Sequence, residues 1–160
     1  MATLLLDCIP ADLEVDRDGD GFIVTVAACE SSEGFYLTLD CRLGPMPDHE
    51  IGTYEFSFGF TVSDLDGGMV PFLTQDRYEV ARYFGDLSRE YVIPTVCAAV
   101  CTLVEDVQPT YIFRVTKGKN LPKQALFKHF AISDVLHGYG FRDVDTGTDA
   151  YGRTFWLLGR

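Results

Sequence analysis

The chain of 160 residues is 47% hydrophobic and 23% charged, with a formal net charge of −11, a composition that indicates one folded domain and excludes disorder. No apolar run approaches the ~20 residues that a membrane-spanning helix needs, and the apolar N-terminus lacks the basic leader of a signal peptide. We therefore expect a single cytoplasmic domain over residues 1–160, with no membrane partner and no direct binding of nucleic acid, because so acidic a protein repels phosphate.

The first third of the chain predicts an antiparallel meander. The stretch 16–21 is rich in Asp and Gly and indicates a hairpin turn between two short apolar runs. Over 53–62 every second residue is aromatic or valine, and this period of two is typical of a strand with one buried face. We expect strands at residues 2–10, 13–15, 22–28, 35–43 and 53–62.

The centre of the chain predicts a buried helix. Apolar residues recur at steps of three and four over 91–107, and Pro109 cannot continue the helix. Helical sequence extends back to about residue 75, but Gly85 and Pro94 favour a bend, so we expect two helices within 75–107.

The last third predicts a strand at 111–116, an amphipathic helix at 123–137 and a closing hairpin of residues 141–145 and 153–158. Together the elements predict an α+β fold: a mainly antiparallel sheet from the N-terminal meander, strand 111–116 and the C-terminal hairpin, packed by helices near 75–107 and 123–137. The residues of the last helix that we expect to face the core are Leu126, Phe127, Phe130, Val135 and Leu136.

The acidic turn near the N-terminus is a candidate metal site. Asp16, Asp18 and Asp20, followed by Gly21, match the first half of a calcium-binding loop. Ala27 occupies the position where a bidentate Glu would close the site, so we favour an acidic hairpin turn, with a weakly bound cation as the alternative. The five cysteines also lack the two-residue spacing of a zinc or redox pair, and we expect neither a metal nor a cofactor.

No catalytic motif is evident in the sequence. His129 and His137 lie eight positions apart on one expected helix, too far to share a metal ion, and His49 lies in a loop. The chain contains no nucleophile elbow and no phosphate-binding glycine loop. We therefore assign no catalytic residue, and an enzyme is the less favoured class of protein.

The basic residues are concentrated late in the chain. Residues 1–106 contain 20 Asp and Glu against five Arg, whereas residues 107–160 contain four Asp against eight Lys and Arg. A cluster of cations near a helix N-terminus attracts anions, although a solvated helix face explains the same pattern. The candidate binding residues are Arg114, Lys117, Lys119, Lys123 and Lys128.

The expected order of three antiparallel strands, helix, strand, helix and hairpin resembles the core of the GNAT acetyltransferases. Residues 120–141 are similar to that family's helix and its Gly-Phe ending, here Gly140-Phe141. The resemblance implies an acyltransferase that uses acyl-CoA, but residues 64–75 contain no counterpart of the family's glycine-spaced pyrophosphate loop. A substrate pocket would then lie between the aromatic face of 53–62 and the end of 111–116, and the candidate acids or bases are Glu55, Tyr111 and Tyr139.

Two functions compete. The uneven charge favours a small acidic protein that acts without catalysis, as an inhibitor, accessory or regulatory factor that binds a protein partner with a basic surface. The alternative is a GNAT-like acyltransferase or another small-molecule-binding enzyme. The sequence leaves open whether the chain forms a homo-oligomer.

Overall fold

The computed structural model describes residues 2–64, 90–116, 118–119 and 121–160. Its strands are β1 (Thr3–Leu4), β2 (Asp16–Asp18), β3 (Gly21–Glu30), β4 (Tyr36–Pro45), β5 (Thr53–Ser63), β6 (Tyr111–Val115), β7 (Arg142–Thr148) and β8 (Thr154–Gly159), and its helices are α3 (Val92–Val107) and α4 (Lys123–Gly138).

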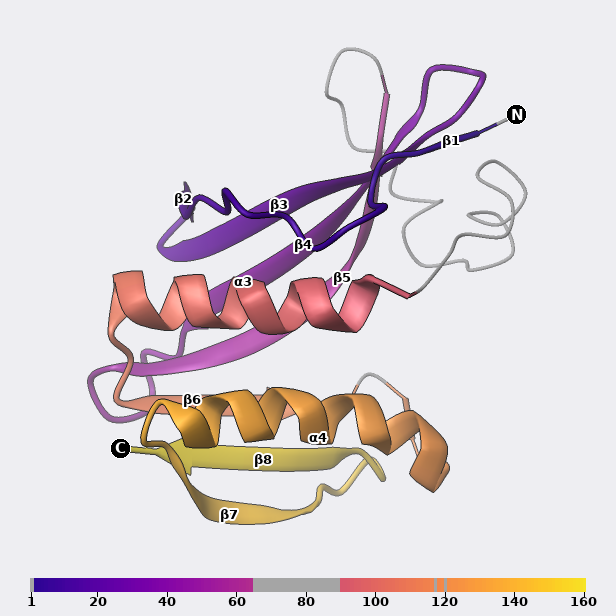
Figure 1. Ribbon diagram of the computed structural model, residues 1–160. Coiled ribbons are helices and arrows are strands. Elements are labelled where there is room, and N and C mark those ends of the chain that lie inside the picture. The colour runs from indigo at the N-terminus through magenta and orange to yellow at the C-terminus, as the bar shows by residue number, and fades with distance from the viewer. Residues whose placement is uncertain (1, 65–89, 117, 120) are drawn as a thin grey trace.

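The architecture is α+β, as the sequence predicts. The strands form one sheet in the order β1-β3-β4-β5-β6-β8-β7, with β2 paired to β3, and most neighbours are antiparallel. Helices α3 and α4 contact each other and lie on the same face of the sheet (Figure 1). Neither helix in the described residues has the length and apolar composition required to cross a membrane.

The N-terminal meander is present, but its first strands differ from the expectation. Of the strand expected over residues 2–10 only Thr3–Leu4 forms, as β1, and residues 13–15 form none, although Leu13 and Val15 pack partly buried against the core. Instead β2 begins at Asp16, inside the expected turn, and pairs Asp18 with Gly21. Only two residues then connect β2 to β3, and the first of them, Gly19, has a φ of 61°, a conformation that glycine adopts without steric cost.

Strands β5 and β6 are parallel neighbours, which the sequence did not predict. Their ladder contains three pairs, Thr53 with Tyr111, Tyr54 with Ile112 and Glu55 with Phe113. Parallel neighbours require a crossover connection, and α3 lies on this crossover. The first part of the expected helical region, residues 75–89, lies outside the described residues.

Helix α3 is the apolar element that the sequence predicts. It ends at Val107, after which Gln108 takes up a left-handed conformation and donates its backbone N–H to the carbonyl of Val104. It packs against strands β3 and β4 and helix α4. Its buried residues are Thr95, Val96, Ala99, Val100, Leu103 and Val104.

Helix α4 occupies the expected range, but two of the five residues expected to face the core are exposed. Phe127 is 69% exposed and Phe130 is 47% exposed, so their assignment to the core was wrong. Leu136 is fully buried and Leu126 and Val135 pack against the core, as expected, and Ile132 is buried in addition. The physical reason is a polar contact, because Arg114 of β6 binds His129 and Ser133 and thereby holds that side of the helix against the sheet.

The buried hydroxyl of Thr95 generates a prediction about stability. Its Oγ1 atom has no hydrogen-bond partner among the described residues, although the side chain is fully buried. Thr95→Val keeps the shape and removes this unpaired group, so we expect the free energy of unfolding to rise by about 1 kcal/mol. Urea denaturation measures the change, with Thr102→Val as the matched control, because the Thr102 hydroxyl donates to the carbonyl of Ala98. A Thr95→Val protein less stable than the wild type would contradict the prediction.

Candidate functional site

A cavity of about 230 Å³ lies where β5 and β6 separate. In Figure 1, β5 rises away from the end of the ladder while β6 continues beside β8 and behind α4. This is the side to which the carboxyl ends of both strands point, the usual position of ligand sites in sheets with parallel strands. The lining residues are Phe56, Ser57 and Phe58 of β5, Arg114 and Val115 of β6, Gly118 and Leu121 of the following loop, and His129 of α4.

Both helices begin near the same end of the sheet. Each runs in the direction opposite to β5 and β6, so their N-termini lie where the two strands diverge (Figure 1). Pro122 precedes the first residue of α4, Lys123, and its side chain makes no capping hydrogen bond. Free backbone amides at a helix N-terminus carry a partial positive charge, and this field favours a negatively charged group nearby.

Arg114 is the buried charge of the cavity. Its residue is only 2% exposed, and its guanidinium lies over the ring of Trp156 with 5.2 Å between the Cζ atom and the ring centroid. Nη1 donates to the carbonyl of His129 and to Ser133 Oγ, each at 3.0 Å, and Nη2 donates to His129 Nδ1 at 3.0 Å. These hydrogen bonds hold the guanidinium in one orientation.

The contacts of Arg114 leave its charge without an anionic partner in the part of the chain that the structure describes. All three hydrogen-bond acceptors are neutral, and no described carboxylate lies within ion-pair distance of the guanidinium. Burial lowers the pKa of Arg114 to about 10, so the side chain is still a cation at neutral pH. A buried cation without a counter-charge destabilises a fold, and such costs are concentrated at functional sites.

His129 completes the polar side of the cavity. Its ring stacks on Trp156 with 5.4 Å between centroids and an interplanar angle of 18°. Burial, reinforced by the charges of Arg114 and Lys128, lowers the pKa of His129 to about 4, so the imidazole is neutral at pH 7. Because a guanidinium only donates, Nδ1 must accept, and the ring proton lies on Nε2. His129 is therefore a hydrogen-bond donor at Nε2 and a poor base.

The edge of β5 provides backbone groups to the cavity, which opens as a cleft between β5 and β6. Residues 56–63 are paired with β4 on one side, but no described strand pairs with them on the side of β6. Since successive peptide groups in a strand point to alternate sides, every second N–H and C=O of this segment is directed toward the cleft. Phe56 and Phe58 supply an apolar wall beside them.

The structure distributes the five residues of the expected basic patch between different environments. Arg114 is buried and bound to α4, as described above. Lys119, Lys123 and Lys128 are exposed on the loop and on α4, and Lys117 lies outside the described residues. Anion binding by the exposed lysines stays a prediction, whereas Arg114 contributes to the cavity and to no exposed patch.

The cavity lies where the sequence predicts a substrate pocket, but the expected acids and bases lie elsewhere. Glu55 is exposed, and Tyr111 lines a separate hollow with His49. The hydroxyl of Tyr139 donates to Glu105 of α3, and this bond raises the pKa of Tyr139. Sequence reasoning considered His129 only as a metal ligand and did not place it in the pocket. It also missed the burial of Arg114, although the alternation of β6 places Arg114 on the same face as the buried Ile112.

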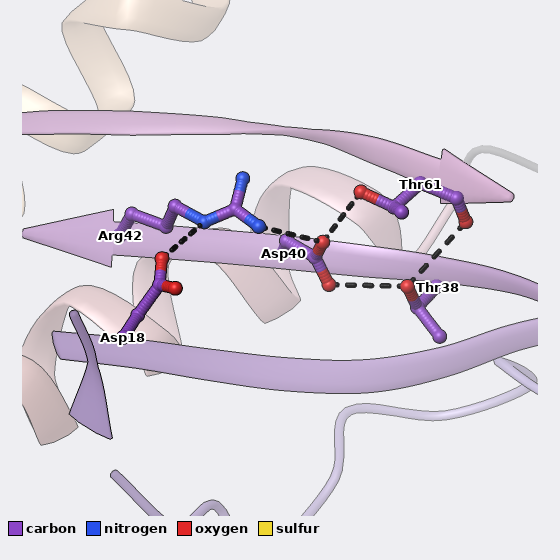
Figure 2. A network of polar contacts seen from close by, with 5 residues as sticks. All are labelled: Asp18, Thr38, Asp40, Arg42 and Thr61. Carbon is purple, nitrogen blue, oxygen red and sulfur yellow. Dashed lines mark hydrogen bonds and ion pairs between the residues drawn. The ribbon is translucent and has the colours of Figure 1, made fainter. Parts of the chain in front are cut away.

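The acidic hairpin takes part in an ion-pair network, which Figure 2 shows. Arg42 of β4 donates to Asp18 at 2.9 Å and to Asp40 at 3.4 Å. Asp40 is 5% exposed and also accepts hydrogen bonds from the hydroxyls of Thr38 and Thr61, at 3.1 and 2.6 Å. Asp18 thus has a cationic partner within the fold, and nowhere in the described residues do three or more His, Cys, Asp or Glu side chains gather so that they could hold a metal ion.

The pKa of His129 generates a prediction about pH dependence. An unfolded histidine binds its proton near pH 6.5, but the folded His129 binds it only near pH 4, so the unfolded chain holds more protons between these values. We therefore expect this residue to lower the free energy of unfolding as the pH falls from about 6.5 to about 4. His129→Gln, which keeps an acceptor for Arg114 but does not titrate, should make the decline shallower in urea denaturation at several pH values. Equal declines in the two proteins would contradict the expectation.

Comparisons with protein-family models, with curated proteins and with solved structures found no match to this chain. The element order on which the resemblance to the GNAT acetyltransferases depends is present, as three antiparallel strands β3 to β5 followed by α3, β6, α4 and the hairpin β7–β8. Because no matched protein assigns a functional site, the argument for one depends on the geometry of the cleft between β5 and β6.

Proposed function

We propose that this chain binds a small molecule in the cleft between β5 and β6 and acts as an enzyme of the acyltransferase type. The single observation that carries the proposal is the end of the parallel ladder at Glu55 and Phe113, beyond which a cavity with a buried cation opens between the strands. Arg114 also fixes α4 to β6, but an apolar residue could pack between these elements without the cost of burying a charge, so the arginine supports a functional role as well.

The edge of β5 that no described strand pairs supports a ligand with an extended chain of amides. Backbone N–H and C=O groups that lack a neighbouring strand can pair with the amides of a bound molecule, as they do when a peptide adds to a sheet edge. Acyl-CoA carries such an amide-containing arm, and the GNAT resemblance points to the same ligand. Phe56 and Phe58 supply apolar surface for the rest of the molecule.

The described residues of the cavity support binding more directly than they support a chemical step. Arg114 and His129 are its titratable side chains in the described part of the chain, and both act as hydrogen-bond donors. Donors can stabilise the negative charge that develops on a carbonyl oxygen during acyl transfer. A general base is not assigned among these residues.

A ligand test separates this proposal from a protein without a small-molecule site. We expect acetyl-CoA or CoA at millimolar concentration to raise the thermal unfolding midpoint, because a ligand at one hundred times its Kd stabilises the folded state by about 2.7 kcal/mol. Ser57→Tyr places a bulky ring at the cavity wall and should abolish the shift. Ser32→Tyr is the matched control, because Ser32 is exposed in a turn and does not line the cavity. No shift in the wild-type protein at millimolar ligand would refute acyl-CoA binding.

A second candidate function is binding of a protein partner with a basic surface, without catalysis. The observation that favours it is the exposure of Asp143 and Asp145 on β7, the last strand of the sheet in the described residues. Exposed carboxylates on a strand at the end of a sheet can steer and orient a basic partner, and salt weakens such association.

This second function has its own test. The tagged protein, incubated with native lysate, should capture a specific partner at low salt and release it at high salt. The double variant Asp143→Asn, Asp145→Asn should capture about tenfold less, whereas Asp48→Asn, Glu50→Gln, which removes the same charge from an exposed turn, should capture nearly as much. Equal capture by both double variants would argue against β7 as the interface.

A further inference from the structure

We propose that Arg114 anchors the carboxylate of an apolar organic acid that enters the cavity between β5 and β6. The inference rests on the proposal that this cleft binds a small molecule, and it adds the chemical class of the group that is recognised. It does not depend on acyl-CoA as the other ligand.

The first argument is a count of the donors of Arg114. A guanidinium has five N–H groups, of which the two on Nη1 and one on Nη2 are matched by His129 and Ser133. The N–H of Nε and the second N–H of Nη2 have no partner in the described residues. Nε and Nη2 form the edge of the guanidinium that binds a carboxylate through two parallel hydrogen bonds.

The second argument concerns charge. The cation is buried, it lines a cavity, and the described part of the chain offers it no carboxylate. The N-termini of α3 and α4 lie toward the same end of the sheet and add to the positive field. An anion supplied by a ligand would provide the missing counter-charge in surroundings where water screens it little.

The third argument concerns the walls and the size of the cavity. Phe56, Phe58, Val115 and Leu121 surround the polar pair with apolar side chains. A volume of about 230 Å³ equals roughly eight water molecules at ~30 Å³ each, so it suits a compact acid such as phenylacetate. The single planar fork of Arg114 matches a monoanionic carboxylate better than a phosphate dianion, which attracts several cations.

The test compares a charged probe with a neutral probe of the same shape. We expect phenylacetate, titrated at pH 7 and followed by amide chemical shifts, to perturb Ser57, Val115 and Gly118, and phenylacetamide to bind about tenfold more weakly. Arg114→Gln should remove this preference, whereas Arg153→Gln, which removes a half-buried cation that pairs with Asp149 in the C-terminal hairpin loop, should retain it. If Arg114→Gln does not fold, the two probes on the wild-type protein still decide the matter.

Several outcomes would overturn the proposal. Equal affinities for phenylacetate and phenylacetamide, or shifts confined to residues outside the cavity, would show that Arg114 only fixes α4 to β6. Tighter binding of phenyl phosphate than of phenylacetate would show that the cavity recognises a phosphate and not a carboxylate. Binding of phenylacetate without any effect of acetyl-CoA would refute the acyltransferase proposal and leave this one intact, and binding of acetyl-CoA without the acid would do the reverse.

Discussion

The short parallel ladder between β5 and β6 is the constraint on which the rest of the structure depends. Three residue pairs join an antiparallel half-sheet of β1 to β5 to a second half of β6, β8 and β7. Both halves continue beyond the ladder, but the right-handed twist of strands carries them apart unless pairing holds them together. The cavity, and the edge of β5 that no described strand pairs, both follow from this separation.

Arg114 shows how the two layers of the fold meet at that point. On β6 it occupies a position that faces the helices, and its hydrogen bonds to His129 and Ser133 set the rotation of α4. The stack of Arg114, His129 and Trp156 is therefore both structural and electrostatic. Burial and the neighbouring guanidinium keep the histidine neutral, while the arginine stays a cation despite its burial, so the same contacts that position the helix also present a positive charge to the cavity.

Local patterns were sufficient to predict β5, α3 and the range of α4, because alternation and helical periodicity depend only on neighbouring residues. They could not predict that residues 53–55 would pair with 111–113, since the choice of a strand partner is made by contacts far apart in the sequence. The same limit explains the errors at Phe127 and Phe130. Their apolar side chains suggest the core, but a polar contact made by a distant strand decides which side of the helix is buried.

The ladder also has a consequence for the order in which the chain folds. Strands β3, β4 and β5 are joined by short turns, and so are β7 and β8, so each group can assemble from local contacts. Residues 53–55 can meet 111–113 only after a long loop has closed, and three ladder pairs offset that loss of entropy only in part. We therefore expect the two half-sheets to form first and to join late, with the cleft as the last feature of the native state to appear.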